Sequence, residues 1–171
     1  MRIAAFDVGV RNLAFVVTEG PTAVVAWEAV ALPGKSLEDN VRALHEVLRA
    51  PPHHFDGLDA VLIERQPPVN RTMSCLAFAL LAFFLPRVPA VHFVDPKTKL
   101  AGFESVEGDE GERGRPREGY RARKARSVTC VRAVLRGSPW LRVLDAAPKR
   151  DDLADAFALA YTWRSAQPVR L

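Results

Sequence analysis

The chain has 171 residues, of which 49% are apolar and 26% are charged. This balance is typical of one globular domain, long enough to bury a core without disulfide or metal crosslinks, and it excludes general disorder. The 24 Lys and Arg residues exceed the 20 Asp and Glu residues, which gives a formal charge of +4 and a sequence pI near 9.4. A basic chain favours a polyanionic partner without requiring one.

Neither a signal peptide nor a membrane-spanning segment is expected. The apolar run before Asp7 is too short for a signal peptide, and the apolar run at 76–85 is far shorter than the roughly 20 residues that cross a bilayer. Cys75 and Cys130 lack the spacing of metal ligands, so we expect two buried, reduced thiols and an intracellular, reducing compartment.

The first third of the chain predicts an antiparallel meander. Residues 2–8 and 12–18 are β-runs separated by a short turn at 9–11, and a third run follows at 22–32. Such short connections pair neighbouring strands in opposite directions.

The middle of the chain alternates helices with strands. Ser36 and Asp39 resemble a capping box and begin a helix. Further along, strands at 60–64 and 91–94 flank an apolar helix at about 70–85. A strand, helix, strand series favours a partly parallel sheet with helices packed over it.

The C-terminal third predicts two more helices after a charged segment. Residues 102–119 are rich in Gly, Glu and Arg and predict a mobile loop within a single domain of residues 1–171. A basic helix at about 120–136 and a final helix at about 150–164 follow.

Two of the predicted central strands end in an acid, Asp7 and Glu64. Asp152 and Asp155 are three residues apart and share one face of the last helix. An ionised carboxylate at the end of an apolar run must reach solvent, a partner or a cation. For Asp7 alone, the plainer alternative is that its side chain organises the turn with Gly9. Taken together, the acids predict a cluster of four carboxylates at one end of the sheet.

Grouped carboxylates raise one another's pKa values or bind divalent cations, and hard oxygen ligands suit Mg²⁺. The chemistry predicted is phosphodiester hydrolysis with two ions about 4 Å apart, one activating water and one stabilising the leaving oxygen. Each acid taken singly is also compatible with a structural role. Asp151, Asp152 and Asp155 suit the dipole at the start of a helix, although Asp155 lies beyond the first turn, which weakens this alternative. Glu64 suits an ion pair with Arg65 or Arg71.

Four motifs resemble the RuvC-like Holliday junction resolvases of the ribonuclease H superfamily, especially the branch found in poxviruses, related large DNA viruses and fungal mitochondria. They span nearly the whole chain, and the last is the most specific: FDVGVRNLA at 6–14, LIERQ at 62–66, YRARKARSV at 120–128 and KRDDLADAFALA at 149–160. The resemblance implies an α/β fold with a ribonuclease H-like mixed sheet, an antiparallel meander plus parallel strands, flanked by helices.

The same resemblance implies a magnesium-dependent endonuclease with two ions per active site and Mn²⁺ as a substitute. It implies paired, symmetric nicks in four-way DNA junctions, in recombination or in the resolution of replication concatemers. The family's acids fall on Asp7, Glu64, Asp152 and Asp155, and its catalytic basic residue on Lys124. A virus-encoded protein acting in the host cytoplasm is the leading expectation, with mitochondrial or nuclear action as alternatives.

Arginines near these motifs are candidates for contacts with DNA phosphates, which neutralise charge without reading bases. For Lys124 and its neighbours, the alternative is a solvated basic helix. The candidate arginines are Arg11, Arg71, Arg121, Arg123, Arg126 and Arg132.

Two symmetric cuts require paired active sites, so we expect a homodimer. The helix at 70–85 is the candidate interface, because its apolar residues point in nearly all directions. A wholly buried central helix is the alternative.

Three other functions remain open at this point. DVGVRN also resembles the phosphate loop of actin-like sugar kinases, although 171 residues leave no room for their two lobes. An RNA:DNA hybrid nuclease of the same superfamily would share all four acids. A non-catalytic junction-binding module would carry a degenerate site, which the presence of all four acids disfavours.

Overall fold

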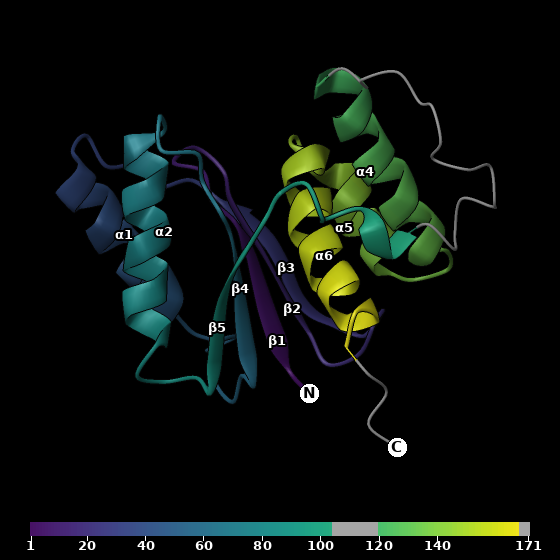
Figure 1. Ribbon diagram of the computed structural model, residues 1–171, viewed down its shortest axis with the longest axis horizontal. Helices are drawn as coiled ribbons and strands as arrows, with labels where there is room; N and C mark the ends of the chain where they lie inside the picture. The colour runs from purple at the N-terminus through teal and green to yellow at the C-terminus, as the bar shows by residue number, and fades with distance from the viewer. Residues whose placement is uncertain (104–119, 168–171) are drawn as a thin grey trace.

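The computed structural model describes residues 1–103 and 120–167, apart from the side chains of Tyr120, Arg121 and Arg123, and has one mixed sheet with helices on both faces (Figure 1). In spatial order the strands are β3 (Val24–Val30), β2 (Leu13–Thr18), β1 (Ile3–Asp7), β4 (Ala60–Glu64) and β5 (Ala90–Val94). The helices are α1 (Leu37–Arg49), α2 (Arg71–Phe84), the 3-10 turn η1 (Ala101–Phe103), α4 (Tyr120–Val134), α5 (Trp140–Ala146) and α6 (Arg150–Ser165).

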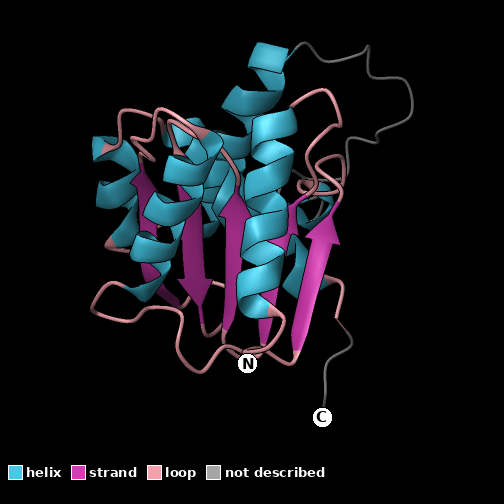
Figure 2. Ribbon diagram, turned by 90° about the vertical axis from the view of Figure 1, so that its left-hand side faces the viewer, coloured by secondary structure: helices cyan, strands magenta, loops and turns pink. Residues whose placement is uncertain are grey.

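The strand directions confirm the predicted combination of a meander with parallel strands. β1, β2 and β3 pair antiparallel, whereas β1 with β4 and β4 with β5 pair parallel, as the arrows in Figure 2 show. The β1–β2 turn is tight enough to need a glycine, because a Cβ on Gly9 would lie 2.7 Å from the carbonyl oxygen of Asn12. The expected α/β fold class is therefore confirmed.

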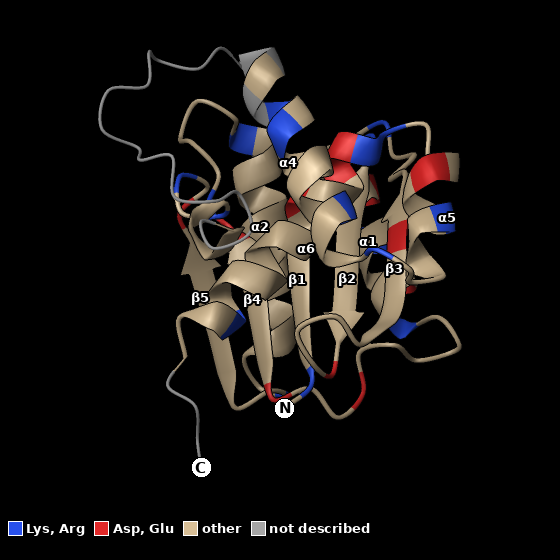
Figure 3. Ribbon diagram, turned by 90° about the vertical axis from the view of Figure 1, so that its right-hand side faces the viewer, with Lys and Arg blue, Asp and Glu red and all other residues tan. Residues whose placement is uncertain are grey.

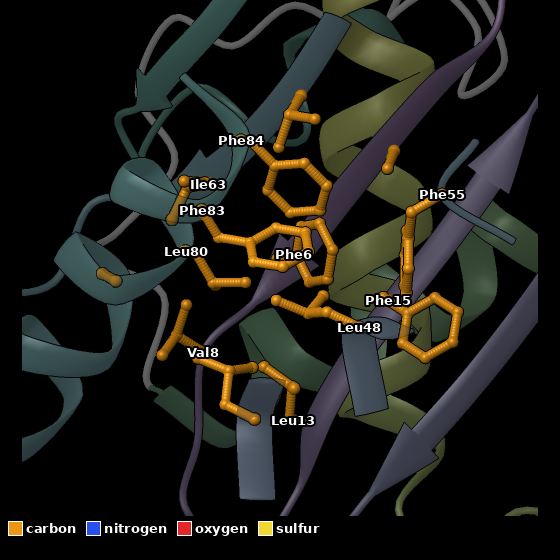
Figure 4. Packing of buried hydrophobic residues seen from close by; sticks show 14 of the residues in the cluster. Phe6, Val8, Leu13, Phe15, Leu48, Phe55, Ile63, Leu80, Phe83 and Phe84 are labelled. Carbon is orange, nitrogen blue, oxygen red and sulfur yellow. The ribbon is translucent and has the colours of Figure 1, made fainter. Parts of the chain in front are cut away.

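One face of the sheet packs against α1 and α2 through an aromatic core centred on Phe6 (Figure 4). The ring of Phe6 lies 5.4 Å from that of Phe55, 5.6 Å from that of Phe84 and 6.0 Å from that of Phe15, counted between centroids. Aromatic rings at these separations bury a large apolar area in a specific geometry. This core anchors β1 at the residue before Asp7.

The other face packs against α6, with α4 and α5 on its outer side (Figure 1). Alternation along β1 sends Ala5 to this face and Phe6 to the opposite one. The indole Nε1 of Trp27 donates to the carbonyl oxygen of Leu153 at 2.9 Å, and its ring lies 5.5 Å from that of Phe157. The first turns of α6 are therefore held to β3 by packing and by a buried hydrogen bond.

Most of the predicted elements are confirmed within a few residues. The Ser36 side chain accepts from the backbone N–H of Asp39, and the Asp39 side chain accepts from that of Ser36, so the capping box of α1 is real. The short helix α5 was not expected. Of the predicted loop at 102–119, Gly102 and Phe103 instead belong to η1, with Phe103 fully buried, and 104–119 lie outside the described residues.

The prediction of two buried thiols is wrong for one of them. Cys130 is buried, but Cys75 is exposed on the outer face of α2. The same face leaves Phe78 61% and Leu85 58% exposed, so α2 is not wholly buried by its own chain. Among the described residues, no helix has the length and apolar character needed to cross a membrane.

Candidate active site

The acidic ends of β1 and β4 lie side by side at one edge of the sheet. The two strands are parallel neighbours, and their register pairs Phe6 with Ile63, so Asp7 and Glu64 emerge next to each other. α6 begins at the same edge, where acidic and basic positions lie close together in Figure 3. Asp7, Glu64, Asp152 and Asp155 all line one cleft of about 690 Å³. The structure thus brings the four predicted acids into one cleft.

Within this cleft, Asp7, Glu64, Asp155 and Lys99 form a buried group that we call the inner cluster. Lys99 Nζ lies 2.5 Å from Asp155 Oδ2 and 3.3 Å from Glu64 Oε1, and a hydrogen bond joins the Asp7 and Glu64 side chains. The side chains of Lys99, Glu64 and Asp155 are 11%, 11% and 8% exposed. Charges held so far from water are costly unless they are paired, which explains the bridging lysine.

Burial and mutual repulsion shape the ionisation of the inner cluster. Burial raises the pKa of Asp7 well above its ordinary value, and the hydrogen bond to Glu64 and the charges of Glu64 and Asp155 raise it further. Burial works to lower the pKa of Lys99, but the carboxylates of Glu64 and Asp155 outweigh it and raise the pKa above its ordinary value. Lys99 is therefore a cation.

A second group, Lys124 with Asp151 and Asp152, lies nearer to solvent, and we call it the outer cluster. Lys124 Nζ donates to Asp151 Oδ2 and lies 3.4 Å from Asp152 Oδ1. Burial alone would raise the pKa of Asp151, but Lys124 lowers it. Burial and the charge of Asp151 raise the pKa of Asp152. Lys124 thus stabilises the ionised form of Asp151 more strongly than that of Asp152.

The inner cluster fits a hard divalent cation in its donor chemistry. Asp155 Oδ1 is buried and has no hydrogen-bond partner among the described residues, so a carboxylate oxygen remains available. Across the described part of the chain, however, no three acidic, histidine or cysteine side chains are close enough together to hold an ion as they stand. Lys99 stands between Glu64 and Asp155, and Lys124 keeps Asp152 in the outer cluster.

Sequence reasoning missed two residues of this site, Lys99 and Asp151. Lys99 follows β5, which pairs parallel with β4 and so ends at the same edge as Glu64. If the predicted strands at 60–64 and 91–94 are taken to pair in parallel, the residues after 94 are expected near the acids. Asp151 is adjacent to Asp152 in the sequence, yet its pairing with Lys124 depends on how α4 meets α6.

Two of the predicted DNA-contacting arginines lie at or near the cleft. Arg11 is exposed and lines it, in the turn between β1 and β2. Arg71 is exposed in the first turn of α2, next to Asn70, which also lines the cleft. Both positions lie on the side from which a polyanion would approach the acids.

The other predicted arginines belong to α4. Arg126 is half-buried on this helix. Arg132 forms an ion pair with Asp145 of α5. The side chains of Arg121 and Arg123 lie outside the described residues.

Three solved structures share the fold over nearly the whole chain. The crystal structure of the fowlpox virus Holliday junction resolvase matches with a TM-score of 0.63 at 19% identity, over 95% of this chain and 96% of that one. The complex of fowlpox virus resolvase with substrate Holliday junction DNA matches with a TM-score of 0.64 at 19% identity, over 98% of this chain and 100% of that one. Thermus thermophilus RuvC in complex with a Holliday junction substrate matches with a TM-score of 0.64 at 23% identity, over 96% and 93%.

Sequence comparison gives a family. No curated protein sequence matches the chain significantly. The sequence profile of the family described as Poxvirus A22 protein, by contrast, matches residues 1–166. Because that match extends over nearly the whole chain, the protein belongs to the Poxvirus A22 protein family.

Proposed function

We propose that this protein is a Holliday junction resolvase, an endonuclease that nicks opposing strands of four-way DNA junctions. The observation that carries the proposal is the meeting of Asp7, Glu64 and Asp155, from β1, β4 and α6, in one cleft of a Poxvirus A22 family member. Two solved relatives of the same fold, from fowlpox virus and Thermus thermophilus, are described in complex with Holliday junction DNA. Action in the host cytoplasm stays a prediction.

The carboxylates proposed to hold Mg²⁺, or Mn²⁺ as a substitute, are Asp7, Glu64, Asp152 and Asp155. This assignment is supported by the hard oxygen donors and by Asp155 Oδ1, which has no partner within the described ranges. When bound, a pair of such ions supplies an activated water and stabilisation of the leaving oxygen. Only the carboxylate form of Asp7 can be a ligand, and burial and Glu64 raise the pKa at which that form appears.

The two lysines of the cleft are proposed to stabilise negative charge on the transferred phosphate. Lys99 and Lys124 both line the cleft and both face its carboxylates. A positioned cation in a water-poor site stabilises developing charge more strongly than it would in bulk water. The family resemblance points to Lys124 alone, and the geometry supports adding Lys99 to that assignment.

Assembly as a homodimer is proposed to use the outer face of α2. Phe78 and Leu85 are exposed there, and a shallow pocket of about 300 Å³ lies beside Phe78, whose ring packs 5.5 Å from that of Phe93. Burying such a face favours association, and two-fold symmetry would supply the second active site. Phe78→Glu should shift the sedimenting species from dimer to monomer, whereas Val143→Glu, on α5, should leave the mass unchanged.

The decisive experiment measures Mg²⁺-dependent cleavage of a synthetic four-way junction against linear duplex DNA and a linear RNA:DNA hybrid. A resolvase cuts the junction at paired, symmetric positions and leaves both linear substrates largely intact. Preference for the hybrid would assign the protein to the hybrid nucleases of the superfamily. Junction binding without cleavage in Mg²⁺ or Mn²⁺ would show that the protein is a non-catalytic binding module.

A further inference from the structure

The segment that carries Lys99 is tied to the second half of α6 by one hydroxyl group. Thr162 Oγ1 donates to the carbonyl oxygen of Lys99 at 2.7 Å. The same oxygen accepts from the backbone N–H of Gly102 at 3.2 Å. A single side chain thus satisfies the carbonyl of Lys99, in the connection between β5 and η1, and the N–H of Gly102, within η1.

Close packing presses the same segment onto the helix. A Cβ built on Gly102 would lie 2.7 Å from Cα and 2.8 Å from Oγ1 of Thr162, which is closer than atoms can approach. The next residue, Phe103, is fully buried, and its ring centroid lies 4.6 Å from that of Tyr161. Only a glycine at 102 permits this approach, so the contact depends on the identity of that residue.

The same helix therefore holds both ends of the Lys99 interaction. Asp155 and Thr162 are seven residues apart on α6, about two helical turns, so they share one face. Asp155 forms an ion pair with the ammonium of Lys99, while the Thr162 hydroxyl donates to the backbone carbonyl of Lys99. A lysine side chain has four rotatable bonds, and fixing its backbone greatly reduces the positions its ammonium can take.

We propose that Thr162 is a positioning residue for the reaction and that it acts through Lys99. Its hydroxyl, seated against Gly102, sets where the Lys99 ammonium stands between Glu64 and Asp155. Thr162 does not line the cleft itself. The inference rests on the proposed function, because it assigns Thr162 a part in that same cleavage.

The first test replaces the hydroxyl without changing the volume. Thr162→Val should lower kcat for junction cleavage by about tenfold or more at nearly unchanged KM, because the lysine is displaced while the DNA surface is intact. Thr162→Ser should restore most of the rate. Ser165→Ala is the matched control, since it removes an exposed hydroxyl on the same helix that donates to Tyr161 O at 3.0 Å.

The second test asks whether Thr162 acts through Lys99. In a Lys99→Met background, Thr162→Val should cause no further loss of rate, because the group that it positions is already gone. Gly102→Ala, whose added Cβ forces the segment away from α6, should lower kcat in the wild-type background. In the Lys99→Met background it should cause no further loss of rate. Losses that multiply in the double variants, or a Thr162→Val enzyme as fast as wild type, would overturn the proposal.

A third measurement is independent of cleavage. Hydrogen exchange at the Gly102 amide should accelerate in Thr162→Val, where its acceptor is lost, and stay unchanged in Ser165→Ala. Unchanged exchange in Thr162→Val would overturn the structural half of the proposal. A wild-type protein that cuts no branched DNA would instead overturn the proposed function, while the exchange result would still decide whether Thr162 holds the segment.

Discussion

The inner and outer clusters have the same arrangement of charges but differ in how deeply their side chains are buried. Each places a lysine ammonium between two carboxylates. The inner side chains are 8% to 11% exposed, whereas those of the outer cluster are 15% to 28% exposed. Since Coulomb interactions and desolvation both strengthen away from water, the inner groups depend far more on one another than the outer groups do.

The difference follows from the elements that supply the acids. Asp7 and Glu64 end strands buried on both faces, so their carboxylates leave the core directly into the cleft. Asp151 and Asp152 lie in the first turn of α6, where solvent reaches one side. The strand end therefore holds Glu64 away from water, whereas the first turn of the helix leaves Asp151 and Asp152 more exposed.

The largest expected effect separates the clusters by activity. Asp7→Asn should lower kcat for junction cleavage by about 10²-fold to 10³-fold, because it removes a buried carboxylate that we propose binds the metal. Asp151→Asn should cost less than about tenfold, since Asp151 does not line the cleft and only pairs with Lys124. Rates come from single-turnover cleavage in Mg²⁺.

Asp56→Asn, at the opposite end of the sheet, serves as the control for that comparison. Junction binding without metal should be similar in all three variants. Near-normal cleavage by Asp7→Asn would show that Asp7 is not an active-site residue.

The next effect concerns stability. Lys99→Met leaves Glu64 and Asp155 buried without their cation and should lower the free energy of unfolding by about 3 kcal/mol. Lys124→Met affects a partly exposed pair and should cost less than about 1 kcal/mol. Urea unfolding in a chelating buffer measures both. Equal losses in the two variants would show that burial does not distinguish the clusters.

The smallest effect is a pair of opposite pH dependences. The pKa of Asp7 is raised above 3.8, so the stability that Asp7 contributes is present below that pH and is lost as the pH rises through the folded-state pKa. Asp7→Asn should therefore gain stability relative to wild type as the pH rises. The pKa of Asp151 is lowered, so its contribution is present above 3.8 and is lost as the pH falls. Asp151→Asn should be less stable than wild type at neutral pH, with the deficit vanishing in acid.

Thermal unfolding of metal-free protein between about pH 3 and pH 7 measures both slopes. The two differences from wild type should run in opposite directions with pH. Parallel slopes would mean that Asp7 and Asp151 experience the same environment, and the distinction between the clusters would fail.

Local patterns in the chain were enough to predict most of the elements, though not α5 or η1, and the acids at the strand ends. Ser36 and Asp39 mark the start of α1 through bonds within one turn, and Gly9 marks the turn after β1. Asp7 and Glu64 follow directly on short apolar runs, and a carboxylate at such a position has to reach solvent, a partner or a cation. Such signals lie within a few residues of one another, so they can be recognised in the linear sequence.

Which lysine pairs with those acids, by contrast, is determined by contacts between distant segments of the chain. Lys99 is 35 residues from Glu64 and 56 from Asp155, and Thr162 is 63 residues from Lys99. No local pattern records these pairings, because they depend on β5 pairing with β4 and on η1 packing against α6. In the same way, Cys75 and Phe78 are exposed because of the side on which α2 meets the sheet. An apolar helix carries no periodic signal of that choice, since every face of it is compatible with burial.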